Sequence, residues 1–230
     1  MRWGLGDAAV GWLVGLVGGA VGFAVVLAVS GTGPDDADNL GLGWLAVAQL
    51  GLWIGLLGAP YLAARFKGNG MRRDFGLRAM WSDLPVGGLC GLIGQFAIFW
   101  VVYVPISWVT DVTAEEFTEP AQDMADRASD PLGVVLLILI VGLGAPIVEE
   151  VFYRGLLQRS LMRRVGPGGG IALASVLFGA AHIQPLQFPA LALAGALFGI
   201  LAYRYGRLGP AIAAHMVFNL TAVISLLVTS

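Results

Sequence analysis

Two adjacent carboxylates and both histidines of this chain lie in or beside long apolar stretches, where ionisable groups are costly and usually functional. They belong to three short patterns: EEVFYR at 149–154, FGAAH at 178–182 and HMVFN at 215–219. A carboxylate, two imidazoles and a carboxamide around a wet pocket could hydrolyse a peptide bond. The carboxylate would act as general base on a water molecule, and N–H groups would stabilise the oxyanion.

The two glutamates are expected to have different roles, because successive residues of a helix point about 100° apart. Glu150 and Arg154 are spaced i,i+4, so the pattern predicts an ion pair that supports the site. Glu149 is then left free to act as the general base. His182 is predicted to orient or activate the water that Glu149 deprotonates.

The other two patterns place further polar groups one helical turn apart. His215 and Asn219 can aim at one point, where we expect them to donate hydrogen bonds to the oxyanion. Phe178 precedes His182 by one turn, and its ring is expected to shield or position the imidazole. Pro146 lacks an N–H, so it should free a backbone carbonyl in the preceding turn, and that carbonyl then needs water or a side chain as a partner.

A metal site is an alternative use of the same groups. Glu149, His182 and His215 form a set of two histidines and one carboxylate, as in many hydrolytic zinc sites. The chain has no HExxH motif, and each of the three ligands would come from a different helix. The spacing is therefore a weak signal for zinc, which is kept as the alternative to a site without a cofactor.

The composition indicates whether the segments that carry these groups lie in water or in a membrane. Of the 230 residues, 57% are hydrophobic and 12% are charged, against roughly 25% charged in soluble domains. We predict an all-α polytopic membrane helix bundle, because a span needs about 20 apolar residues. The single Cys90 excludes an intrachain disulfide, and the short basic runs argue against a nucleic-acid partner. Seven candidate spans lie at about 9–30, 43–66, 84–108, 131–162, 170–186, 188–204 and 208–229.

The loops between these spans alternate in charge. Arginine and lysine gather before the first span and after the second, fourth and sixth, whereas the other loops together contain one basic residue, Arg127. The pattern predicts a cytoplasmic N-terminus and a C-terminus outside. The first helix is expected to remain uncleaved, although cleavage after 28–30 would leave six spans in the same orientation. Counting 1.5 Å per residue from the loops places all three patterns at a similar depth.

The three patterns match, in order, the motifs EExxxR, FxxxH and HxxxN. With them, residues 131–226 resemble the CPBP family of CAAX-processing and bacteriocin-processing (Abi) intramembrane proteases. The resemblance implies a helical membrane endopeptidase, related to the type II prenyl-protein protease. It also implies that Glu149 and His182 activate water, that His215 and Asn219 form the oxyanion hole, and that a glutamate-dependent reaction without a cofactor is favoured over one with zinc. Residues 131–230 would be a catalytic core of four spans, and 1–130, with three spans and an acidic segment, stay unassigned.

The expected substrate is a membrane-embedded or lipid-anchored peptide or protein. A composition rich in glycine and alanine, with more arginine than lysine, suggests a bacterial plasma membrane. A proton-coupled carrier and a catalytically silent scaffold are the non-enzymatic alternatives. The sequence shows no inverted repeat, which disfavours the carrier, and the intact trio of motifs disfavours the scaffold.

Overall fold

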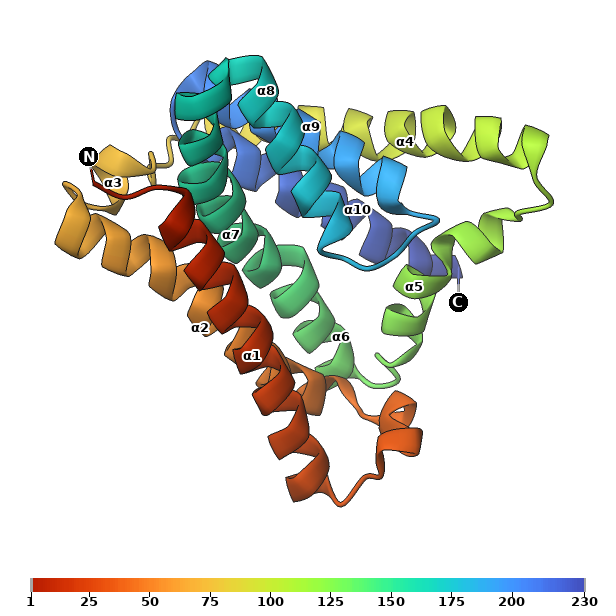
Figure 1. Ribbon diagram of the computed structural model, residues 1–230. Coiled ribbons are helices and arrows are strands. Elements are labelled where there is room, and N and C mark those ends of the chain that lie inside the picture. The colour runs from red at the N-terminus through yellow and green to blue at the C-terminus, as the bar shows by residue number, and fades with distance from the viewer. Residues whose placement is uncertain (1, 230) are drawn as a thin grey trace.

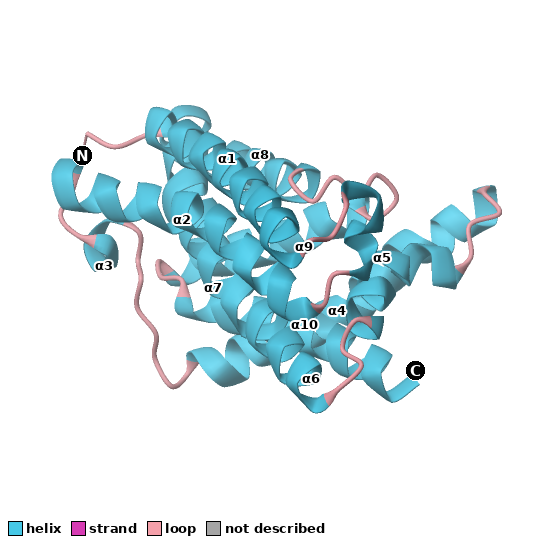
Figure 2. Cartoon of the chain, turned by 90° about the horizontal axis from the view of Figure 1, so that it is seen from below, coloured by secondary structure: helices cyan, strands magenta, loops and turns pink. Residues whose placement is uncertain are grey.

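The computed structural model describes residues 2–229, which are helical throughout apart from connecting loops and contain no strand. Figure 1 shows the order of the helices, and Figure 2 shows the loops only as connections between them. The predicted all-α fold is confirmed. The helices outside 131–180 are α1 (Leu5–Ser30), η1 (Pro34–Asn39), α2 (Leu42–Lys67), α3 (Met71–Asp74), α4 (Asp83–Val109), α5 (Ala114–Asp126), α9 (Phe188–Tyr205) and α10 (Gly209–Thr229).

Residues 131–180 form one long composite element. It consists of α6 (Pro131–Leu137), η2 (Ile138–Gly144), α7 (Ala145–Glu149), η3 (Glu150–Gln158) and α8 (Arg159–Ala180). The segments η2 and η3 are π-helical, so their backbone bonds run from i to i+5. Glu149 and Glu150 lie at the junction where the ordinary helix α7 passes into η3.

Within residues 2–229, six helices rather than seven are long and apolar enough to span a membrane. The difference arises in the composite element, which breaks at Gly166, a glycine with a φ of 77°. The arm after this break is about 20 Å long, shorter than the hydrocarbon core of a bilayer at about 30 Å. The predicted separate span at 170–186 is therefore not confirmed and stays a prediction. Its helix ends at Ala180, and His182 lies in the following turn.

Glycine residues allow two pairs of helices to pack closely. A Cβ atom at Gly18 would meet the backbone of Gly51, so α1 and α2 approach closely along this line. Gly91 of α4 faces the backbone of Ala214 of α10 in the same way. Small residues allow helices to approach each other this closely in membranes. In Figure 1, α1 and α2 form one side, α4, α9 and α10 the other, and α6 to α8 run between them.

The basic loops lie together at one end of the molecule. Arg163 donates from Nη2 to the carbonyl of Trp3 at 2.9 Å, which joins α8 to the chain before α1. Arg159 donates to the carbonyl of Gly206 at 3.1 Å, which joins α8 to the loop between α9 and α10. Three of the loops predicted to share a membrane side thus meet.

The loops without basic clusters also contact one another. Arg127, after α5, donates to the carbonyl of Leu40 at 3.0 Å. Gln187, at the start of α9, donates to the carbonyl of Phe117 at 2.9 Å. The two sets of loops are therefore separate, as their charges suggested. The assignment of the basic end to the cytoplasm stays a prediction.

Candidate active site

The centre of the site is the buried pair of Glu150 and Arg154. Glu150 Oε1 lies 3.1 Å from Arg154 Nη1, and both side chains are at most 1% exposed, so the predicted ion pair is present. Arg154 also donates from Nη2 to the carbonyl of Gly195 in α9, at 3.0 Å. Its guanidinium lies 4.4 Å from the ring centre of Phe178. Because a guanidinium can bond in its plane and stack on its face, Arg154 fixes η3 against both α8 and α9.

His215 is held by the same carboxylate. Its Nδ1 lies 3.0 Å from Glu150 Oε1, so with Glu150 ionised Nδ1 carries the hydrogen and donates it. The imidazole stacks on Phe198 of α9, with ring centres 4.4 Å apart. Neither partner was predicted from the sequence. Glu150 and His215 are 65 residues apart, and Phe198 lies in an ordinary apolar run, so no local spacing indicated these contacts.

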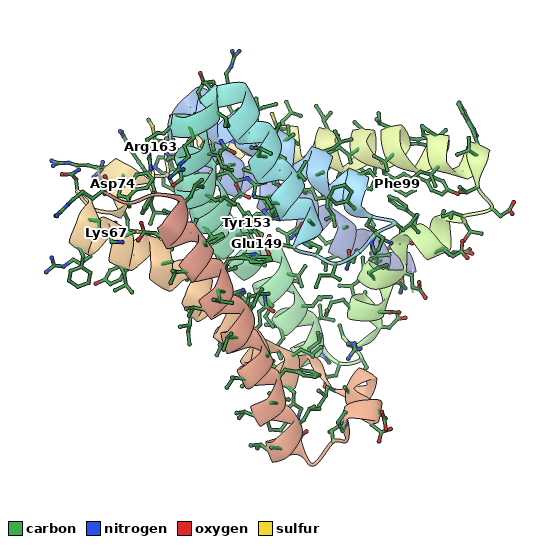
Figure 3. All side chains as sticks on the ribbon, viewed as in Figure 1. Lys67, Asp74, Phe99, Glu149, Tyr153 and Arg163 are labelled. Carbon is green, nitrogen blue, oxygen red and sulfur yellow. The ribbon has the colours of Figure 1, made fainter. Side chains whose placement is uncertain are left out.

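Glu149 approaches the opposite side of the same imidazole. Its Oε2 lies 3.9 Å from His215 Nε2, and its side chain is 18% exposed, whereas Glu150 is completely buried. The two glutamates thus point in different directions, as the helical geometry predicted, but they flank one histidine. Glu149 lies in the middle of the fold beside Tyr153 (Figure 3). Of the two carboxylates, Glu149 is the one that a water molecule can reach.

His182 reaches this region from the turn after α8. Its Nδ1 lies 2.8 Å from the carbonyl oxygen of Phe178. A carbonyl only accepts, so Nδ1 carries the hydrogen, and in the neutral ring Nε2 is free to accept one. The Phe178 ring lies 4.9 Å from that of His182 and 5.7 Å from that of His215. Phe178 is therefore a common neighbour of both histidines.

Asn219 has a backbone partner that follows from the π-helical register. Ala145 N donates to Ile140 O, an i to i+5 bond, so the partner of Val141 O in the same register would be Pro146. Proline has no N–H to donate. Asn219 Nδ2 instead donates to Val141 O at 2.9 Å, so the freed carbonyl predicted from Pro146 has found a side-chain partner. The amide of Asn219 retains a second N–H for another acceptor.

Glu149 and His215, two of the possible zinc ligands, are neighbours in the structure, with Oε2 3.9 Å from Nε2. In the part of the chain described, no group of three or more His, Cys, Asp or Glu side chains is arranged to hold a metal ion. In His215 and His182, Nδ1 is bonded to Glu150 and to the Phe178 carbonyl, so Nε2 is the ring nitrogen that each would offer to a metal. A site without a cofactor stays the favoured prediction and zinc the alternative, and no catalytic step is assigned to a metal.

Comparison with known families gives one match. Residues 131–221 match the family described as Type II CAAX prenyl endopeptidase Rce1-like. This part of the chain is similar to CAAX intramembrane proteases. The segment runs from α6 into α10 and contains all three motifs, so the resemblance drawn from them is confirmed. The comparisons with curated proteins and with solved structures give no match.

The family and the fold together indicate the class of protein. A CAAX protease segment supports endopeptidase activity inside a membrane, and the six apolar helices support an integral membrane protein with several spans. Residues 2–130 lie outside the matched segment. They nevertheless pack directly against the site: Trp53 of α2 lies against Gly144, at the start of the turn that carries Glu149.

Proposed function

We propose that the protein is an intramembrane endopeptidase of the bacterial plasma membrane that cleaves membrane-embedded or lipid-anchored peptides. One observation carries the proposal: His215 is flanked by both glutamates of the first motif, a buried one at Nδ1 and an accessible one at Nε2. The buried Glu150 and Arg154 hold the imidazole in place. The accessible Glu149 can therefore do chemistry beside a positioned ring.

The reaction begins with a water molecule bound between Glu149 and the free Nε2 of His182. Glu149 takes a proton from the water, whose oxygen forms a bond to the peptide carbonyl carbon. The resulting oxyanion accepts hydrogen bonds from the second N–H of Asn219 and from His215 Nε2. The role of His215 requires both ring nitrogens to carry hydrogen, and Glu150 balances that charge. As the C–N bond breaks, Glu149 returns the proton to the departing amine.

The decisive experiment measures cleavage of a membrane-peptide library by the purified full-length protein. General bases contribute about 100-fold to 10,000-fold to a rate, so Glu149→Gln should lose at least about 100-fold in kcat. Glu119→Gln makes the same chemical change on the exposed face of α5 and should leave cleavage unchanged. Full activity of the Glu149→Gln protein would overturn the assignment.

The roles of His182 and of the substrate lipid are tested in the same assay. His182→Ala should slow cleavage strongly without changing the unfolding temperature, since the ring lies in a turn at the end of α8. Because the matched family is named for a prenyl endopeptidase, the library should contain a farnesylated peptide and its unmodified counterpart. Proton-linked flux in vesicles without any cleavage would instead favour the carrier.

A further inference from the structure

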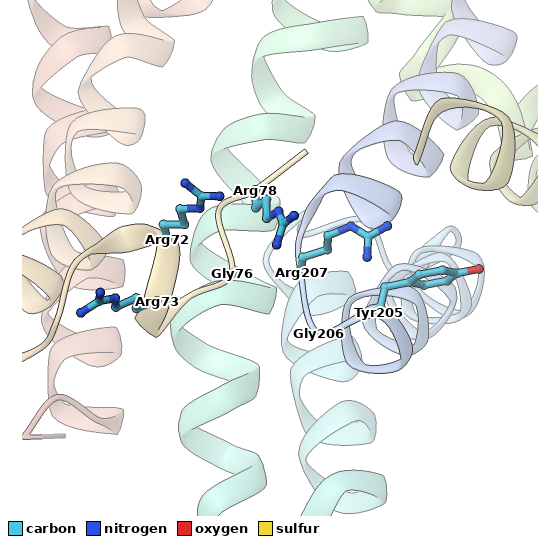
Figure 4. A pocket seen from close by; sticks show the side chains of 7 residues that line it. All are labelled: Arg72, Arg73, Gly76, Arg78, Tyr205, Gly206 and Arg207. Carbon is cyan, nitrogen blue, oxygen red and sulfur yellow. The ribbon is translucent and has the colours of Figure 1, made fainter. Parts of the chain in front are cut away.

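The short segment 71–78, between α2 and α4, separates two hollows of opposite character. On one side lies a polar cavity of about 440 Å³ at the basic end of the molecule, lined by four arginines and by Tyr205 (Figure 4). On the other side lies an apolar groove of about 750 Å³ along α2. The segment itself lines both, with Arg72 and Arg78 in the cavity and Met71 and Leu77 in the groove.

The cavity carries an excess of positive charge. Arg207 is paired with Asp83, whose Oδ1 lies 2.5 Å from Arg207 Nη2, and this bond raises the pKa of Arg207 further. Arg72, Arg73 and Arg78 line the same cavity, and none of them forms an ion pair with a carboxylate of residues 2–229. In Figure 4, Arg72 points toward Arg78, whereas Arg73 points away from it. Three guanidinium groups without a carboxylate partner thus line one cavity, which suits an anion with several oxygen atoms.

The cavity has a fixed wall. Gly76 accepts a hydrogen bond from Leu208 N at 2.8 Å, which attaches the 71–78 segment to the start of α10. Gly76 has a φ of 67°, and a Cβ atom there would meet Arg159 Nη2 and Gly206 O, so only glycine fits this position. The arginines are therefore carried by an anchored turn at the ends of membrane-spanning helices, near the level of lipid headgroups.

The apolar groove lies next to the polar cavity, so a ligand whose anionic group lies in the cavity could extend an apolar part into the groove. It runs along α2 from Tyr61 to Leu50, about 16 Å at the rise of a helix, and its other lining side chains include Trp53 and Ile54. It starts beside the cavity, because Met71 directly precedes Arg72 and Leu77 directly precedes Arg78 in the sequence. A free phosphate ion would use only the cavity, whereas a molecule with a charged head and an acyl chain would use both.

We propose that this pair of hollows binds an anionic phospholipid of the surrounding bilayer. The phosphate lies between Arg72 and Arg78, and one acyl chain lies along α2. The site is distinct from the residues assigned to hydrolysis. Through Trp53, which contacts Gly144, the bound chain would border the turn that carries Glu149.

Native mass spectrometry of the full-length protein in detergent tests the charged half of the site. The probes are phosphatidylglycerol and phosphatidylcholine with identical acyl chains. We expect one phosphatidylglycerol to be retained preferentially, and Arg72→Gln/Arg78→Gln to weaken its binding about 30-fold, since each basic residue near a membrane surface contributes about fivefold. Arg72→Lys/Arg78→Lys keeps both charges and should retain most of the affinity. Arg65→Gln/Arg164→Gln removes two exposed charges outside the cavity and should change little.

A second pair of variants tests the apolar half. Gly58 lines the groove, and a Cβ atom there meets nothing within 4 Å, so Gly58→Phe should fill the groove without a clash. Gly43, on the same helix, is equally open but lies outside the groove, and Gly43→Phe is the matched control. Loss of phosphatidylglycerol from Gly58→Phe alone supports the proposal.

Three results would overturn it. Equal retention of phosphatidylglycerol and phosphatidylcholine would show that the arginines do not select an anionic lipid. Competition by glycerol phosphate as strong as that by the whole lipid would reduce the site to a simple anion site. Displacement of the lipid by a farnesylated peptide at equal concentration would make the groove part of the substrate path. None of these measurements depends on cleavage, so they are independent of the proposed protease activity.

Discussion

Replacement of Arg154 by methionine should be the most destabilising single change at the site. It removes the cation 3.1 Å from Glu150 Oε1 and leaves that carboxylate buried beside His215 alone. It also leaves the carbonyl of Gly195 without its 3.0 Å donor. Breaking a buried ion pair by removing one partner costs about 3–5 kcal/mol, because a buried charge is left uncompensated. We expect a loss of this size in the free energy of unfolding.

The double variant Glu150→Gln/Arg154→Met distinguishes an uncompensated charge from lost packing. With both charges removed, only the packing and the hydrogen bonds are lost. The loss in free energy of unfolding of the double variant should therefore be at least about 2 kcal/mol smaller than the sum of the two single losses. The free energies can be measured by reversible unfolding in mixed micelles of sodium dodecyl sulfate and a mild detergent. Tryptophan fluorescence can follow the transition.

The control and the refuting result come from the same cycle. Arg164→Met removes an exposed arginine from the same composite element and should change stability by less than about 0.5 kcal/mol. Strictly additive losses in the Glu150 and Arg154 cycle would show that the pair is not coupled. The account of Glu150 as a carboxylate held between Arg154 and His215 would then fail.

Further predictions concern packing, the proline turn and metal dependence. Gly91→Ala should cost about 1–3 kcal/mol in thermal unfolding, because its Cβ meets the Ala214 backbone, whereas Gly88→Ala on the same helix has room and should be nearly neutral. Asn219→Asp should lower kcat at least about 100-fold and also reduce stability, since a carboxylate cannot donate to Val141 O. Adding Pro146→Ala, which supplies a backbone N–H, should restore stability but not cleavage, and recovered cleavage would refute the oxyanion role. A chelator should leave cleavage unchanged, and activity that disappears and returns with zinc would contradict the metal-free reaction.

Several features of the site could be predicted because they depend on spacing within one helix. The ion pair of Glu150 and Arg154 and the neighbouring positions of Phe178 and His182 are one-turn relations. They follow from the helical period alone. The need for a partner near Pro146 followed in the same way from the missing N–H of proline. The location of the apolar helices also followed from composition and length, apart from the break at Gly166, which divides the composite element into arms of unequal length.

The long-range contacts could not be predicted in this way. Nothing in the sequence indicates that His215 Nδ1 meets Glu150, that Asn219 serves Val141 O, or that Phe198 stacks on His215. These contacts depend on the rotation and depth of α9 and α10 against η2 and η3, which are set by close packing of small residues and by the π-helical turns. The sequence alone indicated that the protein lies in a membrane, that it is all-helical, and which chemical groups should lie at a similar depth in that membrane. Only the tertiary structure decided which groups touch, because a helix of known period can still present any face to a neighbour.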